Sequence, residues 1–275
     1  MSRPTSRLLI IAGSDPGGGA GLQADIKTAA AFGVYAMTAV TAVTVQDTTE
    51  VYSVHNLPAA LVRDQITVCL KDIGVDAIKI GMLGDGDIAL AVAETLEAED
   101  SGTPLILDPV LTASDGTEFL DSGGIKLLEK RLLPLAALVT PNLPETERLV
   151  GILPRSEEDF RQAAERFAGF GCPNTLFKGG HGDGPILRDV LVDANSGALT
   201  YFDAPRQDSR HTHGTGCTLS TAIACGLALD WPFEEAVRQA HAFVQSAIRT
   251  APGLGGGRGP LNHFLRAKAG DQSGL

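Results

Sequence analysis

The sequence predicts an α/β fold in which helices cover both faces of a mostly parallel central sheet, a three-layer α/β/α arrangement. Short apolar runs typical of buried strands alternate with amphipathic segments of helical period along nearly the whole chain. The strand-like runs are apolar throughout, as expected where both faces of a sheet are covered. With 275 residues and 44% hydrophobic side chains, the chain can bury a full core. We expect one domain over residues 1–266 and a disordered tail over residues 267–275.

The elements follow one another in a regular order. A buried strand at 8–12 leads through a glycine-rich loop at 13–21 into an amphipathic helix that Gly33 ends. Further short runs bounded by turn residues are expected as strands at 35–45, 51–54, 77–80, 105–107, 137–140, 175–178, 190–192 and 199–202. Apolar residues at three- and four-residue spacing predict helices at 59–71, 87–97, 124–131, 145–149, 157–167, 215–229 and 232–249.

Charge and cysteine content exclude several classes of protein. The formal net charge of -11 argues against a nucleic-acid or anionic-membrane surface, so we expect no nucleic acid and no membrane as partner. The run at 8–13 is too short for a signal or a transmembrane helix. The four cysteines show no zinc-ligand spacing and indicate free thiols in a reducing compartment. We therefore expect a cytoplasmic protein.

The stretch at 213–220 predicts an anion-binding helix start. Gly214, Thr215 and Gly216 stand where a buried helix begins, so their backbone N–H groups converge at the positive end of its dipole. Cys217 lies in the same first turn, where a thiolate is favoured over the thiol. Together they point to phosphoryl transfer. The alternative is a glycine-rich turn capping a packed helix, with Cys217 as a small core residue.

Charged residues follow three expected strands, at the sheet edge where ligands of such folds lie. Asp108 and Glu145 suit a Mg²⁺ ion that keeps several waters, although a turn residue and a first-turn helix acid are the plainer interpretations. Lys178 closes an apolar strand before two glycines and is expected to contact phosphate. The loop at 13–21 fits neither a Walker A nor a Rossmann fingerprint, and a simple turn needing positive φ is its alternative.

Seven segments, taken in order, resemble the hydroxymethylpyrimidine/phosphomethylpyrimidine kinases of thiamine biosynthesis, members of the ribokinase-like superfamily. They lie at residues 11–25, 41–48, 78–83, 107–110, 140–145, 178–181 and 213–220. The resemblance implies a ribokinase-like fold and the ATP- and Mg²⁺-dependent phosphorylation of hydroxymethylpyrimidine and then of its monophosphate. Small-molecule substrates are thus the expected partners, and we expect the chain to form a homodimer.

The resemblance also implies roles for individual residues. Gly13, Asp25 and Gln46 would contact the pyrimidine, and Met82 and Val110 would line its pocket. The residues expected at the transfer site are Asp108 and Glu145 for Mg²⁺, Lys178 for the ATP phosphates, Gly214, Thr215 and Gly216 as anion hole, and Cys217 in the place of the usual aspartate base.

Three positions depart from the family's pattern. Gly17 replaces the usual serine, Ser114 the usual lysine, and Asn262 a common histidine. The loss of the lysine raises the question of how the nucleotide, or the phosphate of the second substrate, is neutralised. Two alternatives remain open: a pyridoxal/pyridoxine kinase of the same superfamily, and a nucleotide-binding regulatory protein that has lost turnover.

Overall fold

The computed structural model describes residues 5–99, 102–112, 116–179 and 184–265. Ser114, His181 and the predicted tail at 267–275 lie outside these residues. Within them, the strands are β1 (Arg7–Ser14), β2 (Tyr35–Gln46), β3 (Val51–Asn56), β4 (Ala77–Ile80), β5 (Leu105–Leu107), β6 (Leu138–Val139), β7 (Asn174–Phe177), β8 (Ile186–Asp193) and β9 (Ala198–Pro205). The helices are α1 (Gly21–Ala31), α2 (Ala59–Asp72), α3 (Gly86–Ala98), α4 (Ser122–Leu127), α5 (Leu143–Val150), α6 (Glu157–Gly169), α7 (Thr215–Ala228) and α8 (Phe233–Arg249).

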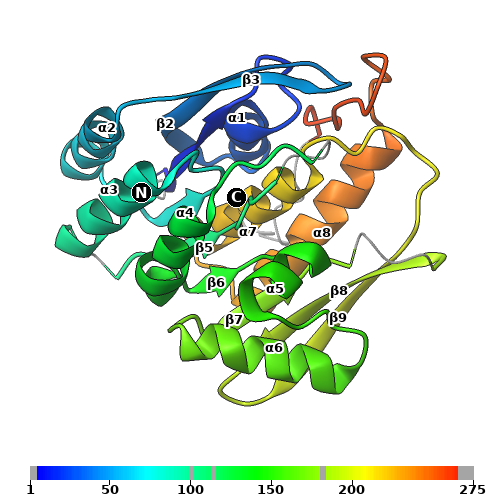
Figure 1. Ribbon diagram of the computed structural model, residues 1–275. Helices are drawn as coiled ribbons and strands as arrows, with labels where there is room; N and C mark the ends of the chain where they lie inside the picture. The colour runs from blue at the N-terminus through cyan, green and yellow to red at the C-terminus, as the bar shows by residue number, and fades with distance from the viewer. Residues whose placement is uncertain (1–4, 100–101, 113–115, 180–183, 266–275) are drawn as a thin grey trace.

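The described strands form one nine-stranded sheet in the order β3-β2-β1-β4-β5-β6-β7-β8-β9 (Figure 1). Neighbours from β2 to β7 pair in parallel. β3 pairs antiparallel at one edge, and β7, β8 and β9 form an antiparallel ribbon at the other. The expected mostly parallel sheet is therefore confirmed. Its parallel strands all end at the same edge, which gathers the residues that follow them.

Helices cover both faces of the sheet, as the uniformly apolar central strands require. One core cluster lies between the sheet and the side chains of α2, α3, α4, α5 and α6, and includes Ile66, Val92 and Phe167. The other lies between the sheet and α1, α7 and α8, and includes Leu22, Ile223 and Val244. All four residues of β4 and all three of β5 are buried. The three-layer α/β/α prediction is thus confirmed.

The predicted helix at 124–131 differs most from the structure. The α-helix begins at Ser122, where the Asp121 side chain accepts a hydrogen bond from the Gly124 N–H and so caps the first turn. It then continues as a π-helical turn at Leu128–Leu132 and a 3-10 turn at Leu133–Leu135. The run of leucines hides this change of period from a pattern search. Among the described residues, no helix is long and apolar enough to cross a bilayer.

Candidate active site

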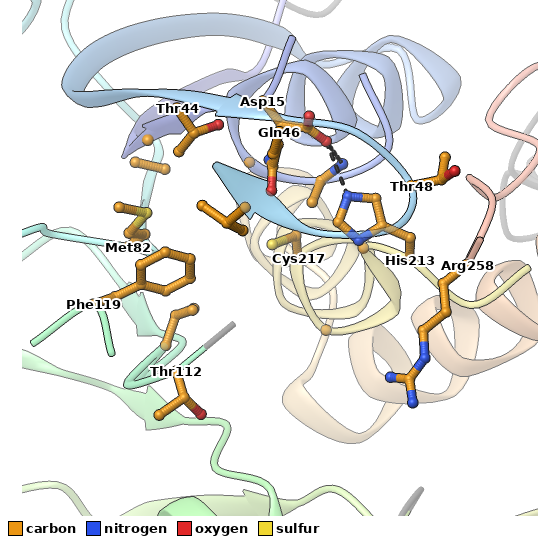
Figure 2. A pocket seen from close by; sticks show the side chains of 18 of the residues that line it. Asp15, Thr44, Gln46, Thr48, Met82, Thr112, Phe119, His213, Cys217 and Arg258 are labelled. Atoms are coloured by element: carbon orange, nitrogen blue, oxygen red, sulfur yellow. Dashed lines mark hydrogen bonds and ion pairs between the residues drawn. The ribbon is translucent and has the colours of Figure 1, made fainter. Parts of the chain in front are cut away.

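A cavity of about 580 Å³ opens at the carboxyl edge of the central strands. Its lining residues come from the ends of β1, β2, β4, β5 and β7, from the β2–β3 hairpin, and from the start of α7 (Figure 2). Nearly all the residues predicted for the site line this cavity: Gly13, Gln46, Met82, Asp108, Val110, Glu145, Lys178, Gly214, Gly216 and Cys217. The structure therefore brings the two sequence-predicted groups, pyrimidine contacts and transfer residues, to one place.

Two close approaches shape the start of α7. Gly214 precedes the helix with φ +81°, and a β-carbon there would clash with the backbone oxygen of Gly19. A β-carbon at Gly216 would lie 3.3 Å from Lys178 Nζ and 3.7 Å from Asp108 Oδ2. The absence of a side chain at Gly216 leaves the helix terminus open beside these charges. The N-terminus of α7 and the Lys178–Asp108 pair consequently face the same space.

The open N–H groups at this terminus belong to Gly216 and Cys217. In the described residues neither has a backbone acceptor, since the helix begins at Thr215 and the first intrahelical bond runs from Thr218 to Gly214. The position of Thr215 contradicts the prediction that this residue belongs to the anion hole. Its N–H points to the Thr212 carbonyl at 3.3 Å, its hydroxyl donates to the same oxygen at 2.7 Å, and it does not line the cavity. It closes the turn before the helix instead.

Cys217 lies at the base of the cavity, and is not the core residue of the plainer interpretation (Figure 2). Its acidity contradicts the expectation of a preformed thiolate. Burial, together with the smaller effects of the Asp25 and Asp108 charges, raises the pKa of the thiol to about 11. The Lys79 ammonium and the Gly21 N–H favour the thiolate but do not outweigh burial. Desolvation therefore overrides the helix dipole.

Asp108, Lys178 and Glu145 form the charged side of the cavity. Lys178 Nζ donates to Asp108 Oδ1 at 2.7 Å and lies 3.8 Å from Glu145 Oε2. The Thr140 hydroxyl donates a hydrogen bond to Asp108 Oδ1 at 3.2 Å. Burial opposes ionisation of Asp108, but the Lys178 and Lys79 charges lower its pKa below the ordinary value. Asp108 is therefore a buried carboxylate with a fixed partner, and not an ordinary turn residue.

Glu145 combines a structural and an electrostatic role. It completes a capping box with Asn142 at the start of α5, accepting from the Asn142 N–H at 2.7 Å. Burial, with a smaller contribution from the Asp108 charge, raises its pKa to about 7 despite Lys178 nearby. Among the described residues, Lys178 is the one cation within ion-pair distance of Asp108 and Glu145, so two carboxylates share one direct partner. This surplus of anionic oxygen suits a hard divalent cation that takes one or two carboxylates and completes its shell with water and phosphate. The residues fit Mg²⁺.

Asp25 does not touch the cavity, which corrects the expected pyrimidine contact. Its carboxylate is fully buried behind Cys217, where it accepts from Lys79 Nζ at 2.7 Å and from the Thr221 hydroxyl at 2.7 Å. Both of its oxygens are engaged by neighbouring elements, β4 and α7. Lys79, in contrast, lines the cavity, although no pattern in the sequence singles it out.

The opposite wall of the cavity suits a small flat ring. Met82 and Phe119 lie side by side on it (Figure 2). Val110 lines it as well, and Gly13 lies close to the Met82 sulfur. Gln46 ends β2, and its side-chain amide forms no hydrogen bond with any residue that the structure describes. An uncommitted amide offers one donor group and one acceptor beside an apolar wall.

Asp15 and His213 form a pair that no pattern in the sequence predicts. Asp15 accepts from the N–H groups of Gly17, Gly19 and Ala20, and its Oδ2 lies 3.1 Å from His213 Nε2 (Figure 2). The pair ties the first glycine-rich loop to the segment before α7. An aspartate before Pro-Gly is a turn signal that identifies half of this contact. The histidine is 198 positions away, so no local pattern reveals it.

Known proteins resemble this chain along most of its length. Residues 15–262 match the family described as phosphomethylpyrimidine kinase. The chain is 44% identical to the hydroxymethylpyrimidine/phosphomethylpyrimidine kinase of Streptomyces coelicolor, over 93% of each chain. It is also 44% identical to the thiamine biosynthesis bifunctional protein ThiED of Geobacter sulfurreducens, covering 96% of this chain but 54% of that protein, so it spans about half of that relative.

A solved structure extends the comparison. The ADP complex of Bacillus subtilis pyridoxal kinase superimposes with a TM-score of 0.85 at 32% identity, covering 94% of this chain and 97% of that one. The match is in keeping with the ribokinase-like fold expected from the sequence. On the extent of the family match and the identity to its named relatives, the chain belongs to the phosphomethylpyrimidine kinase family.

Proposed function

We propose that this chain uses ATP to phosphorylate 4-amino-5-hydroxymethyl-2-methylpyrimidine and then its monophosphate, giving the pyrophosphate used in thiamine biosynthesis. The observation that carries the proposal is a single cavity with two unlike walls. One wall presents the open N–H groups of Gly216 and Cys217 beside Lys178 and Asp108. The other presents the uncommitted amide of Gln46 on an apolar surface. Phosphate chemistry and recognition of a polar ring thus meet in one site.

Gln46 supplies the ring specificity in this proposal. An aminopyrimidine places a ring nitrogen acceptor next to an exocyclic amine donor, and an amide side chain complements both. Met82 and Val110 contact the ring faces, and Gly13 leaves room at its edge. Leaving the polar ring atoms unpaired in a closed site costs about 1–3 kcal/mol, enough to discriminate against rings without this pattern.

The transfer residues act on the acceptor oxygen and the phosphoryl group. The acceptor hydroxyl oxygen attacks the γ-phosphorus of ATP as its bond to the ADP oxygen breaks, and Cys217 takes the hydroxyl proton. The N–H groups of Gly216 and Cys217 stabilise the charge on the moving phosphoryl oxygens. Lys178, held by Asp108 at 2.7 Å, is placed to contact the ATP phosphates. Asp108 and Glu145 would hold Mg²⁺, which neutralises phosphate charge when bound.

Replacing Glu145 with glutamine is expected to raise the Mg²⁺ concentration needed for half-maximal rate several-fold. The amide keeps the shape and still accepts from the Asn142 N–H, so α5 stays capped, but one anionic oxygen donor is lost. Exposed Glu147 on the same helix is the matched control, and Glu147→Gln is expected to keep the parent titration curve. A Glu145→Gln curve that coincides with the parent curve removes Glu145 from the metal site.

A panel of acceptors tests the function directly. The purified protein is given ATP and Mg²⁺ with hydroxymethylpyrimidine, its monophosphate, pyridoxal or pyridoxine, and ADP formation is measured. We expect turnover with the two pyrimidines and at least about tenfold lower kcat/KM with the pyridine alcohols. Preference for pyridoxal would favour the alternative that the Bacillus subtilis structure suggests. ADP formation with none of them would support a regulatory protein.

The homodimer and the cytoplasmic location stay predictions.

A further inference from the structure

The basic side chains of the cavity fall into two groups. Those that line it in the described residues are Lys79, Lys178, Arg210 and Arg258. Both lysines are neutralised, because Lys79 is 2.7 Å from Asp25 and Lys178 is 2.7 Å from Asp108. Arg258 differs from them. Its guanidinium makes no hydrogen bond or ion pair with any other residue that the structure describes, and it is exposed beside His213 (Figure 2). It is a cation without a partner at a phosphate site.

The backbone of Arg258 is anchored on both sides of the cavity. Its N–H donates to the Thr48 carbonyl at 2.8 Å, and the Gly257 N–H donates to the Thr48 hydroxyl oxygen at 3.0 Å. Thr48 lies at the tip of the β2–β3 hairpin, just beyond the end of β2. On the other side, the His213 N–H donates to the Gly259 carbonyl at 3.2 Å. Arg258 therefore stands between the hairpin that carries the ring contact and the loop that leads into the anion hole.

Arg210 is placed differently. It is exposed as well, but its Nη1 lies 3.5 Å from the Gly256 carbonyl, and among the described residues its backbone forms no hydrogen bond with the hairpin. Of the two arginines, Arg258 has both the fixed backbone and the uncommitted side chain.

On the proposed function, the two acceptors of this enzyme differ in charge. The first is a neutral alcohol, while the second carries a phosphate dianion that must approach the γ-phosphate of ATP. In that second step an oxygen of the acceptor phosphate bonds to the γ-phosphorus, and the bond from this phosphorus to the ADP oxygen breaks. A further cation is needed only there, since both lysines already face carboxylates. A guanidinium binds phosphate oxygens in a bidentate manner and stays charged at all relevant pH values.

We propose that Arg258 binds the phosphate of the phosphorylated pyrimidine and so favours the second phosphorylation over the first. This inference rests on the proposed function. It assigns Arg258 to the acceptor and not to the nucleotide, because its backbone is bonded to the hairpin that follows Gln46. Arg258 forms no covalent bond in either step. In this proposal, the phosphate of the ligand is the anionic partner of the Arg258 guanidinium.

The test compares both reactions in the parent protein and in Arg258→Ala. KM and kcat are measured for hydroxymethylpyrimidine and for its monophosphate at saturating ATP, and KM for ATP is measured with each. We expect the ratio of kcat/KM for the phosphate to that for the alcohol to fall at least about tenfold, mainly through KM of the phosphate. Arg258→Lys should recover part of this ratio, since a point charge replaces the bidentate contact.

The possible results separate cleanly. An increase in KM for ATP that is equal in both reactions would overturn the proposal by placing Arg258 on the nucleotide. An equal loss with both acceptors at unchanged KM for ATP would also overturn it, as a structural effect. Arg238→Ala on α8, an exposed arginine paired with Glu234, is the control and should leave the ratio unchanged. A parent protein that phosphorylates neither pyrimidine refutes the proposed function itself, and with it this inference.

Discussion

Replacing Cys217 with serine is expected to slow turnover at least tens of times while the protein still folds and binds both substrates. A placed base contributes about 10²–10⁴-fold to such a proton transfer, and a serine hydroxyl keeps the size of the side chain but accepts a proton far less well. The Gly216 N–H and the Lys178–Asp108 pair remain in the variant. Steady-state kcat and KM measure the effect. Nearly full kcat in Cys217→Ser would make the cysteine a packing residue at the anion hole.

The pH dependence distinguishes these alternatives further. Burial raises the pKa of the Cys217 thiol to about 11, so only about one molecule in 10⁴ carries the thiolate at pH 7. Since the base acts in its deprotonated form, kcat/KM should rise with pH through the alkaline range, by up to about tenfold per pH unit. Cys217→Asp should recover part of the rate and lose this rise, because the ordinary pKa of a carboxyl lies far below the alkaline range. A parent profile that stays flat would contradict the thiolate as base.

Alkylation gives an independent measure of the same thiol. Iodoacetamide should inactivate slowly at pH 7 and faster as pH rises, and bound pyrimidine should protect. Cys69 is the other partly exposed cysteine, so Cys69→Ala provides the background in which to follow the reaction. Cys172 and Cys225 are buried and should react only on unfolding.

The main elements of the sheet could be predicted because their signals are local. Residues 77–80 and 105–107 were expected as strands and form β4 and β5 with these bounds. Such runs are apolar on both faces, so burial and sequence pattern coincide. The β8–β9 hairpin is longer than expected, Ile186–Asp193 and Ala198–Pro205. In its outer part, buried or half-buried residues alternate with exposed ones. Pairing between the two strands extends the hairpin, and one strand's sequence alone does not reveal this pairing.

Within the site, the residues that the sequence placed correctly are those next to strand ends. Asp108 and Lys178 follow β5 and β7 directly, so the parallel sheet brings them together. Asp25 was misplaced because its partner decides its role, and Lys79 is 54 positions away. The prediction of a Cys217 thiolate was wrong for a related reason. The helix dipole is visible in the sequence, but desolvation depends on side chains that only the fold assembles.

Removing one member of the Lys79–Asp25 pair is expected to cost far more stability than removing both. Lys79 and Asp25 are each fully buried, and the pair crosses from β4 to α1 with 2.7 Å between Nζ and Oδ2. Lys79→Met leaves the Asp25 carboxylate buried with only the Thr221 hydroxyl as partner, which should cost about 3–5 kcal/mol. For a chain of this size, the midpoint of thermal unfolding should fall on the order of 10 °C.

The double variant Lys79→Met/Asp25→Leu tests whether the loss comes from the stranded charge. Without either charge, no carboxylate is left unpaired, so most of the stability should return. The control is Lys71→Met, which removes a lysine from the exposed pair with Glu99 at 3.1 Å and should leave the midpoint nearly unchanged. Equal losses in the single and double variants would show that Lys79 stabilises through packing.

A stable double variant also has a catalytic consequence. The Lys79 charge lowers the pKa of the Cys217 thiol while Asp25 raises it, so removing both should shift the alkaline rise in kcat/KM less than removing Lys79 alone.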